Sequence, residues 1–236
     1  MSSTPRSRPV IAIDGPAASG KSTTARAVAD ALGYAHIDSG ALYRAVTLLA
    51  LERPEPPERW RGEDLVERSR ERGLGLAPFA PPATAQVTVA GALLGEALRS
   101  EAVTAEVSRV AAMGPVREFV NRLLRAAAAD GGVVLDGRDI GTAVFPDAEV
   151  KVFLVADPAE RARRRLVERG HAADPARVRA EAQDLVRRDR HDSTRDVAPL
   201  ARAPDAELLD TTALSFAEQV QAIVDLVRRR PGAAAR

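Results

Sequence analysis

The chain has 236 residues, 45% of them hydrophobic and 28% charged, which is enough to bury a core without disulfides or structural metal ions. The formal net charge of +1 and the 3% of aromatic residues argue against a nucleic-acid-binding protein. The absence of cysteine excludes disulfides and thiolate metal sites. No stretch approaches the ~18 apolar residues of a membrane-spanning helix. We therefore expect a soluble, cytoplasmic monomer that contacts neither membrane nor nucleic acid.

The N-terminal third predicts an alternation of short buried strands and helices. In chain order these are a strand over 10–14, a helix from Ser22 to about residue 32, a strand over 35–37 and a helix over 41–52. Gly33 is well placed to end the first helix in a left-handed cap, and Pro54 ends the second. The β-α-β-α order indicates an α/β fold with a parallel sheet flanked by helices.

Residues 58–112 have a different pattern, and they predict an inserted subdomain. A charged helix ending near Gly73 is followed by a proline-rich turn. The alternating run 86–89 suits a small antiparallel strand, and a helix is expected from about Thr104.

The core elements resume after this segment. They are a helix over 115–129, strands over 133–135 and 150–155, helices over 157–170 and 174–191, a strand over 208–209 and a helix over 215–230. Two of these helices have the sequence of a capping box, Asp157 with Glu160 and Ser215 with Glu218. Strands and helices therefore continue to alternate to the end of the chain.

Residues 15–22 match the phosphate-loop motif G-x-x-x-x-G-K-[ST], and they lie between a predicted strand and a predicted helix, as that motif requires. Backbone N–H groups and the positive end of the helix form a cradle for phosphates, Lys21 can bridge the β- and γ-phosphates, and the Ser22 hydroxyl can bind Mg²⁺. Lys21 and Lys151 are the only lysines in the chain. The motif predicts ATP or GTP with Mg²⁺ as phosphoryl donor, bound by Gly15, Pro16, Ala17, Ala18, Ser19, Gly20, Lys21, Ser22 and Thr23.

Three classes of nucleotide-binding protein share this loop. A regulatory GTPase is nearly excluded, because no Asn/Thr-Lys-x-Asp segment that would read guanine surrounds Lys151. A motor or assembly ATPase needs large interaction surfaces for which 236 residues leave little room, although Leu135-Asp136 imitates part of its acidic strand end. A small-molecule or nucleotide kinase fits the length best.

Ligands of open parallel sheets bind beyond the carboxyl ends of the strands. Asp38, Ser39, Tyr43 and Arg44 follow the second predicted strand, and residues 136–139 follow the third. Ordinary turns also favour Asp and Gly, so each cluster alone is ambiguous. Together with the phosphate loop, the two clusters indicate an acceptor site.

With these blocks in this order, the chain resembles the bacterial cytidylate kinases, which are nucleoside monophosphate kinases, over nearly its whole length. The resemblance rests on residues 13–22, 38–44, 108–112 with 116–117, 137–142 with 145–148, 161–165, and 188–189 with 192, 195 and 198–200. It implies a single three-layer P-loop kinase domain over 1–236, with a monophosphate-binding insert at 58–112 and a helical lid at 157–192. It also implies phosphoryl transfer from ATP to CMP or dCMP.

The resemblance implies roles for individual residues as well. Ser108, Arg117 and Asp139 match the cytosine-reading positions, where a carboxylate facing the amine and a guanidinium facing N3 and O2 would select cytosine over uracil. The other implied substrate-binding residues are Ser39, the phosphate-binding Arg44, Arg138 and Arg188, the sugar-binding Asp192, and Arg195. The implied catalytic residues are Lys21, Arg138, Arg188 and, in the lid, Arg164, with Arg161 and Arg165 as further lid charges.

No general base is expected, because the acceptor phosphate is largely dianionic near neutral pH. Lid closure would exclude water from the transfer.

If the acceptor were instead an alcohol such as shikimate, Asp38 would become a candidate base or metal partner. A scaffold that binds ATP only to regulate another protein is the alternative outside catalysis. The three histidines, His36, His171 and His191, are expected at surface or lid positions.

Overall fold

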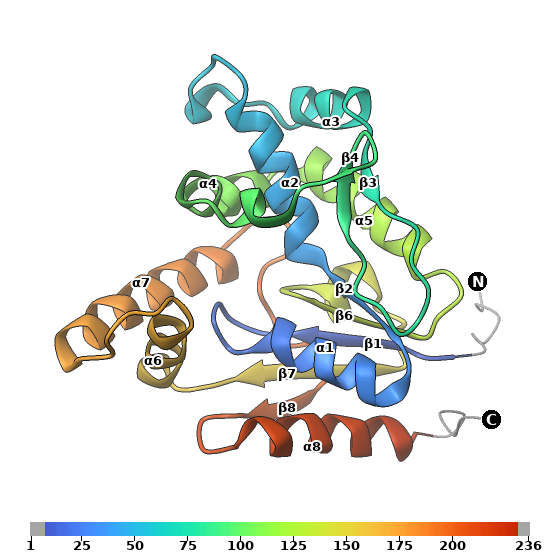
Figure 1. Cartoon of the computed structure of the whole chain (residues 1–236), viewed down its shortest axis with the longest axis vertical. Coiled ribbons are helices and arrows are strands. Elements are labelled where there is room, and N and C mark those ends of the chain that lie inside the picture. The colour runs from blue at the N-terminus through green and yellow to red at the C-terminus, as the bar shows by residue number, and fades with distance from the viewer. Residues whose placement is uncertain (1–7, 231–236) are drawn as a thin grey trace.

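The fold is built on a five-stranded sheet in which every strand runs parallel to its neighbours (Figure 1). The computed structural model describes residues 8–230. In spatial order the strands are β2 (Ala35–Asp38), β6 (Val133–Gly137), β1 (Val10–Asp14), β7 (Val150–Val155) and β8 (Glu207–Asp210). The sequence predicts all five strands and their parallel arrangement, so the α/β fold class is confirmed.

Alternate side chains of the central strand β1 enter two separate cores, one on each face of the sheet. The flanking helices are α1 (Lys21–Leu32), α2 (Ser39–Leu51), α5 (Gly114–Ala127) and α8 (Phe216–Arg228). Ile11 and Ile13 pack with α1 and α8, whereas Val10 and Ala12 pack with α2 and α5. All four side chains are fully buried, which explains why the strand is a continuous apolar run. The result is three layers of helices, sheet and helices (Figure 1).

The segment between α2 and α5 forms a separate lobe, at the top of Figure 1. It contains η1 (Pro57–Arg59), α3 (Gly62–Glu71), β3 (Leu74–Leu76), β4 (Val87–Val89), β5 (Ala92–Leu93), η2 (Gly95–Arg99) and α4 (Glu101–Ala111). Its strands form an antiparallel sheet, which confirms the strand expected over 86–89. Strands β3 and β5 were not predicted, because three and two residues offer too little alternation. Helix α4 begins before Thr104 because the Ser100 hydroxyl caps it, accepting from the N–H of Val103.

A second protrusion consists of α6 (Pro158–Glu168) and α7 (Pro175–Ser193), which pack against each other (Figure 1). Each helix begins at an aspartate whose carboxylate accepts two backbone N–H bonds from the first turn. Asp157 accepts from Ala159 and Glu160 at 2.8 and 3.3 Å. Asp174 caps α7 in the same way. The predicted helix starts are confirmed here.

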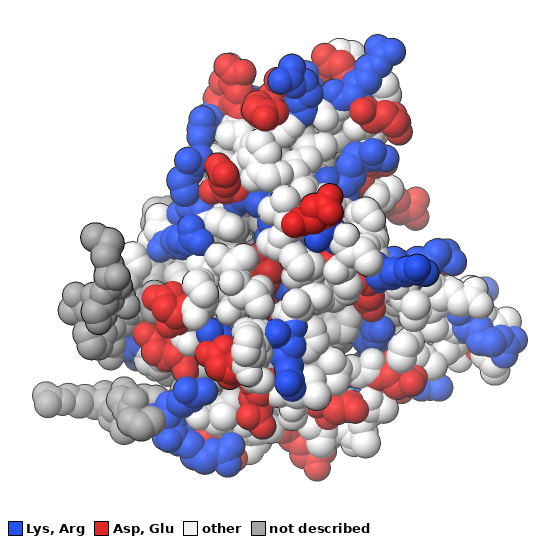
Figure 2. All heavy atoms as spheres, turned by 180° about the vertical axis from the view of Figure 1, so that it is seen from behind, with Lys and Arg blue, Asp and Glu red and all other residues white. Residues whose placement is uncertain are grey.

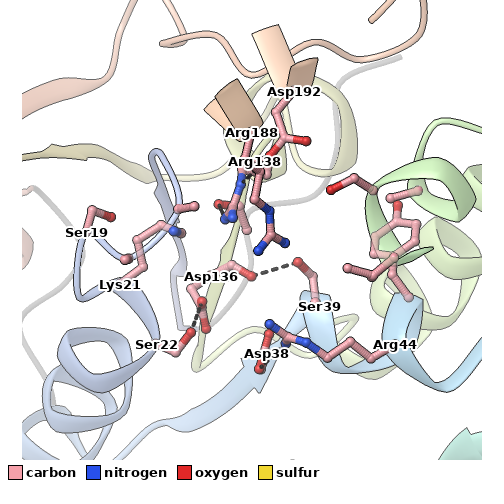
Figure 3. A pocket seen from close by; sticks show the side chains of 18 of the residues that line it. Ser19, Lys21, Ser22, Asp38, Ser39, Arg44, Asp136, Arg138, Arg188 and Asp192 are labelled. Atoms are coloured by element: carbon pink, nitrogen blue, oxygen red, sulfur yellow. Dashed lines mark hydrogen bonds and ion pairs between the residues drawn. The ribbon is translucent and has the colours of Figure 1, made fainter. Parts of the chain in front are cut away.

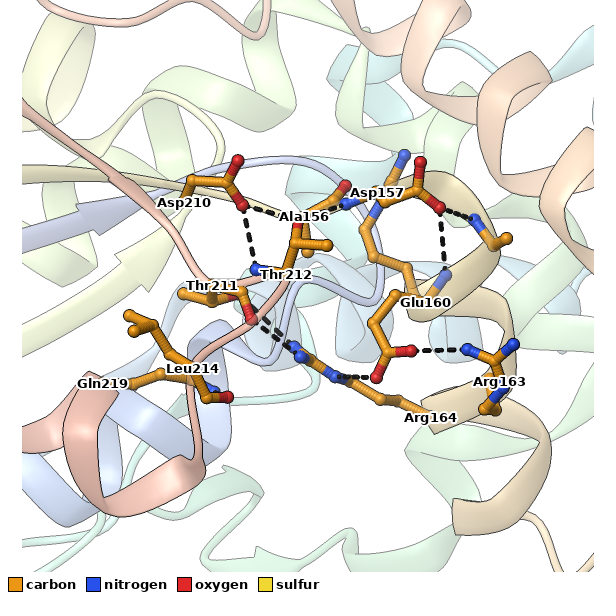
Figure 4. Close-up of polar contacts among 12 residues, drawn as sticks. Ala156, Asp157, Glu160, Arg163, Arg164, Asp210, Thr211, Thr212, Leu214 and Gln219 are labelled. Atoms are coloured by element: carbon orange, nitrogen blue, oxygen red, sulfur yellow. Dashed lines mark hydrogen bonds and ion pairs between the residues drawn. The ribbon is translucent and has the colours of Figure 1, made fainter.

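The capping box expected between Asp157 and Glu160 does not form. The Glu160 carboxylate accepts instead from Arg163 and Arg164 at 2.6 and 3.0 Å, as Figure 4 shows. The Asp157 N–H donates to the Thr212 hydroxyl at 2.9 Å. Two guanidinium partners therefore replace the single backbone N–H, because charge-assisted hydrogen bonds are the stronger ones. The other expected box, at the start of α8, is present.

Surface charge is mixed in sign, in keeping with the net charge of +1. On the face shown in Figure 2, acidic and basic side chains alternate without a large area of one sign. His171 and His191 are exposed, as expected. His36, however, is buried, because its strand β2 packs beside β6 and its ring meets Asp136. Among the described helices, none is both long and apolar enough to cross a membrane.

Candidate active site

A cleft of about 520 Å³ opens beyond the carboxyl ends of the central strands. Residues 17–23 of the phosphate loop line one side of it. Gly15 and Pro16 form the turn that leads from β1 into the loop and do not line the cleft. The structure brings nine other predicted residues to the same cleft, namely Ser39, Arg44, Ser108, Arg117, Arg138, Asp139, Arg188, Asp192 and Arg195.

The phosphate loop starts in a backbone conformation that requires glycine. Gly15 has a φ of 152°, and a Cβ at this position would lie 2.2 Å from the carbonyl oxygen of Leu154 on the neighbouring strand β7. The loop ends at Gly20, and α1 begins at once with Lys21. The free N–H groups of the first turn of α1 are therefore at the cleft, where they favour an anion.

Lys21 lies inside the cleft at the start of α1 (Figure 3). Its side chain is 6% exposed, and its Nζ donates to the carbonyl oxygen of Pro16 at 2.7 Å. Burial and the nearby Arg138 cation lower the pKa of Lys21 to about 7, against the opposite effect of neighbouring carboxylates. A phosphate group in the cleft would favour the charged form, so this amine is suited to bind an anion.

Ser22 and Asp136 bring two oxygen atoms together next to the loop. The Ser22 hydroxyl donates to Asp136 Oδ2 at 2.6 Å (Figure 3). The other carboxylate oxygen, Asp136 Oδ1, lies 2.8 Å from His36 Nε2. Burial raises the pKa of Asp136, but hydrogen bonds from His36 and Ser22 outweigh it and hold the pKa below its ordinary value. A hydroxyl and an ionised carboxylate are hard oxygen ligands of the kind that Mg²⁺ prefers. The residues present fit a magnesium ion that also binds nucleotide phosphates.

The ends of β2 and β6 meet at one point beneath the cleft. The Ser39 hydroxyl donates to the carbonyl oxygen of Asp136 at 2.7 Å, and a Cβ on Gly137 would lie 2.7 Å from that hydroxyl oxygen. Asp38 caps α2 and lies 3.8 Å from Arg44. Burial and the neighbouring Asp136 raise the pKa of Asp38. Two strand ends far apart in sequence thus form one wall.

The far side of the cleft holds a buried ion pair. Arg117, on α5, is 3% exposed and donates to the carboxylate of Asp139, which is 4% exposed. The same guanidinium donates to the carbonyl oxygen of Ala111 at 3.0 Å and lies 5.5 Å from the ring centre of Tyr43. Burial opposes the charge of Arg117, but Asp139 raises its pKa above the ordinary value. Ser108, half-buried on α4, lines the cleft beside the pair.

Arginines gather between this pair and the phosphate loop. Arg138 donates to Asp192 at 3.1 Å, and Arg195 donates to the Asp192 carbonyl oxygen at 3.1 Å. Burial and the neighbouring Arg138 cation lower the pKa of Arg188 to about 10. Its Nε is buried and has no hydrogen-bond partner among the residues that the structure describes. Arg188 and Arg138 point into the cleft toward Lys21 (Figure 3), which is an arrangement suited to a phosphate group.

Helix α7 is tied directly to the phosphate loop. Asp189 Oδ1 accepts from the N–H of Ala17 at 2.8 Å, and its Oδ2 accepts from Arg161 at 2.6 Å. Arg161 also donates to the carbonyl oxygen of Ala17 at 2.7 Å. No role was predicted for Asp189 from the sequence, although residues 188–189 belong to the motifs of the family resemblance.

The structure does not bring Arg164 into the cleft. Its guanidinium donates to the carbonyl oxygen of Thr211 at 2.8 Å and to Glu160 at 3.0 Å, on the side facing the β8–α8 connection (Figure 4). Arg165, one position further along α6, lines the cleft and pairs with Glu181 at 2.9 Å. One residue turns a helix by about 100°, which explains why neighbouring arginines face different directions.

Asp14 connects the start of the phosphate loop with the backbone that follows Asp139. Its carboxylate accepts from the N–H groups of Ile140 and Gly141 at 2.8 and 2.7 Å, in a π-helical turn (Ile140–Val144) that follows Asp139. Burial raises the pKa of Asp14 to about 7, although the two backbone bonds lower it. The sequence places Asp14 at the end of a buried apolar run, but its partner Ile140 is 126 residues away and leaves no local pattern.

A parallel sheet whose first strand leads into a phosphate loop, with a cleft full of arginines beyond it, defines a P-loop kinase fold. The family model for cytidylate kinase matches residues 11–229, and the chain belongs to the cytidylate kinase family. The resemblance stated from the sequence is thereby confirmed.

Individual relatives agree with the family model. The chain is 44% identical over 229 residues to a cytidylate kinase of Chlorobaculum tepidum, covering 93% of both chains, and 46% identical to one of Geobacillus kaustophilus, covering 94% of this chain and 97% of that protein. It is 47% identical to a bifunctional pantoate ligase/cytidylate kinase of Synechococcus sp. (strain CC9311), of which it spans 45%. An uncharacterised protein from Eubacterium ventriosum has a similar fold, with a TM-score of 0.51 at 11% identity, covering 94% of this chain and all of that one.

Proposed function

We propose that the protein transfers the γ-phosphoryl group of ATP to CMP or dCMP and releases ADP with CDP or dCDP. The observation that carries the proposal is the buried Arg117–Asp139 pair, which shares its cleft with the phosphate loop. The Asp139 carboxylate can accept a hydrogen bond from the cytosine amine, and the Arg117 guanidinium can donate to N3 and O2. Uracil has an oxygen in place of that amine, so Asp139 would repel it. Ser108 would complete the contacts to the base.

The arginines would hold the phosphate of the acceptor. Arg44, Arg138 and Arg188 come from α2, the end of β6 and α7, so they can surround a phosphate group from three directions. Asp192 would bind the sugar, with Arg195 assisting. The buried Nε of Arg188 supports this assignment, because an unpartnered donor costs free energy until it binds an acceptor.

Transfer needs positioning and charge neutralisation rather than a base. An oxygen of the acceptor phosphate bonds to the γ-phosphorus while the bond to the β–γ bridging oxygen breaks, and ADP leaves with that electron pair. The acceptor oxygen carries no proton that must be removed. Lys21, Arg138 and Arg188 would neutralise the charge on the transferring group. Ser22 and Asp136 would hold Mg²⁺, which neutralises part of the phosphate charge.

Two further lobes would assist the transfer. Residues 58–112, with α4 carrying Ser108, would form the monophosphate-binding insert, and residues 157–192 a lid that excludes water. Arg165 is better placed than Arg164 to reach the transferring group from the lid, because it lines the cleft. We also propose that the protein acts as a monomer in the cytoplasm, for which the mixed surface charge and the lack of cysteine are the support.

The test is the release of ADP from Mg²⁺-ATP with a series of acceptors. CMP, dCMP, UMP, AMP, GMP, dTMP and shikimate are each compared with a control that lacks an acceptor. Stimulation mainly by CMP and dCMP is expected. Stimulation mainly by another nucleotide would contradict the roles of Arg117, Asp139 and Ser108, and release without any acceptor dependence would contradict the kinase function. An alcohol acceptor such as shikimate is not favoured, because the relatives are cytidylate kinases.

A further inference from the structure

His36 takes part in a chain of hydrogen bonds that ends at the proposed magnesium ligands, and the bond between His36 and Asp136 in this chain is buried. Its ring is 4% exposed, with Nε2 2.8 Å from Asp136 Oδ1 and Nδ1 3.3 Å from the Thr84 hydroxyl. The Thr84 hydroxyl accepts from Arg26 Nε at 3.2 Å. At the other end, Asp136 Oδ2 accepts from Ser22 at 2.6 Å. Both oxygens of the carboxylate are therefore bonded.

From Arg26 to Asp136, each group of this chain can donate to the next one. Arg26 can only donate, so the Thr84 hydroxyl accepts from it and has its own hydrogen left for His36 Nδ1. Nε2 then carries the ring hydrogen, and this N–H donates a hydrogen bond to Asp136 Oδ1. This tautomer is assigned from the network. Both ring nitrogens then have a hydrogen-bond partner, and Asp136 accepts from the ring.

Thr84 is held opposite the ring by the backbone. The N–H of His36 donates to the carbonyl oxygen of Ala83 at 2.9 Å, and the N–H of Ala85 donates to the carbonyl oxygen of His36 at 2.8 Å. Residues 83–85 thus run along β2, at the edge of the main sheet. Residues 83–85 belong to the inserted lobe. The lobe therefore helps to hold His36, and through it Asp136, in place beside the phosphate loop.

We infer that His36 is a positioning residue, which fixes the carboxylate of Asp136 so that Oδ2 stays beside the Ser22 hydroxyl, ready for the Mg²⁺ that accompanies the nucleotide. This inference rests on the proposed function. Without the bond from His36, the Asp136 carboxylate could rotate and lose its alignment with Ser22. When a residue that orients a metal ligand in this way is mutated, metal affinity or activity typically falls about 10- to 100-fold.

The test measures how strongly Mg²⁺ improves nucleotide binding. The dissociation constant of ADP is measured by calorimetry with excess MgCl₂ and with EDTA, and the ratio of the two values gives the contribution of the metal. His36→Leu is expected to reduce this ratio about tenfold, since it removes the bond to the ligand. His36→Gln, whose amide can donate at the position of Nε2, is expected to keep most of it. The exposed His171→Leu is the matched control and should leave the ratio unchanged.

A ratio for His36→Leu within about twofold of the native value would overturn the inference, since a purely structural role would weaken binding equally in both conditions. If His36→Leu does not fold, Thr84→Val carries the test: the ring loses its partner, and a ratio reduced about threefold supports the inference, whereas an unchanged ratio contradicts it. A native ratio of one would contradict the magnesium ligands themselves. The acceptor series tests the proposed function separately, so the two failures are distinguishable.

Discussion

The two sides of the cleft are built from different parts of the chain. The side proposed to bind the phosphoryl donor consists of consecutive residues, 17–23, and offers mainly backbone N–H groups with one side-chain cation, Lys21. The acceptor side consists of side chains from α2, α4, α5, α7 and the end of β6. A backbone cradle depends on local geometry, whereas the acceptor side depends on each side chain and on the packing of several elements. Substitutions should therefore separate the two sides cleanly.

The largest effect is expected for Lys21→Ala. In the proposed mechanism Lys21 neutralises charge on the transferring group, so removing this one cation of the phosphate loop should lower kcat about a thousandfold with every acceptor. The dissociation constant of CMP, measured by calorimetry, should change by less than about twofold. Lys21→Arg should also lose most of the turnover. Lys21 is 6% exposed, so the space around its side chain does not accommodate the bulkier guanidinium. Equal losses of kcat and of CMP affinity would contradict the separation of the cleft into a phosphate-loop side and an acceptor side.

Arg188→Met should lower kcat/KM for CMP about a hundredfold, the loss expected for a charge-assisted hydrogen bond to phosphate. The same variant should be more stable than the native protein. Burial and Arg138 lower the pKa of Arg188 to about 10, which shows that its charge is held at a cost. We expect the Tm to rise by about 3 °C. Arg187→Met, which removes the exposed neighbour on α7, is the control and should change neither quantity.

A smaller effect is expected where α7 meets the phosphate loop. Asp189→Asn weakens the bonds to Ala17 and Arg161, and kcat/KM for ATP should fall about tenfold. The KM for CMP should stay within about twofold, because Asp189 contacts the donor side. The exposed Asp184→Asn on the same helix should have no effect. If Asp189→Asn raises the KM for CMP and leaves that for ATP unchanged, α7 belongs to the acceptor side alone.

The smallest effect concerns Asp14, which joins the two sides. Its pKa is about 7 in the folded protein against 3.8 ordinarily, so between these values the folded protein holds a proton that the unfolded chain has released. The contribution of Asp14 to stability is therefore complete below about pH 4 and is lost as pH rises through 7. Relative to Asp14→Asn, the native free energy of unfolding should fall by about 1 kcal/mol or more over this window.

Denaturant titrations at several pH values measure this difference, with the exposed Asp30→Asn as the control. Parallel curves for the native protein and Asp14→Asn would contradict the raised pKa of Asp14.

The contrast between the two sides also explains what the sequence could predict. The phosphate loop is contiguous, so its motif and flanking elements could be recognised directly. Four of the acceptor residues follow the ends of β2 and β6, namely Ser39, Arg44, Arg138 and Asp139, and the parallel topology predicts that they lie together. The acceptor residues on α4, α5 and α7 were predicted only from the family resemblance. Pairings such as Asp189 with Ala17, 172 residues apart, leave no local pattern. Arg164 was predicted for the cleft because a helix rich in arginine does not show which of its faces is covered.

The histidines illustrate the same limit. His36 lies in an otherwise apolar strand, and the usual preference of histidine for intermediate positions favoured the surface. Its partners, Thr84 and Asp136, are 48 and 100 residues away. A polar ring can be buried only where hydrogen-bond partners lie beside it, and the fold is needed to show that Thr84 and Asp136 lie beside His36.

The central claim is that Asp139 reads the cytosine amine and takes no part in binding the donor. The most direct measurement is calorimetric titration of the native protein and of Asp139→Asn with CMP, UMP and Mg²⁺-ADP. The native protein should bind CMP at least about tenfold more tightly than UMP, and Asp139→Asn should lose that preference, since an amide can pair with either base. Its affinity for Mg²⁺-ADP should be unchanged. An Asp139→Asn protein that still prefers CMP, or that loses Mg²⁺-ADP affinity to the same extent, would contradict the account.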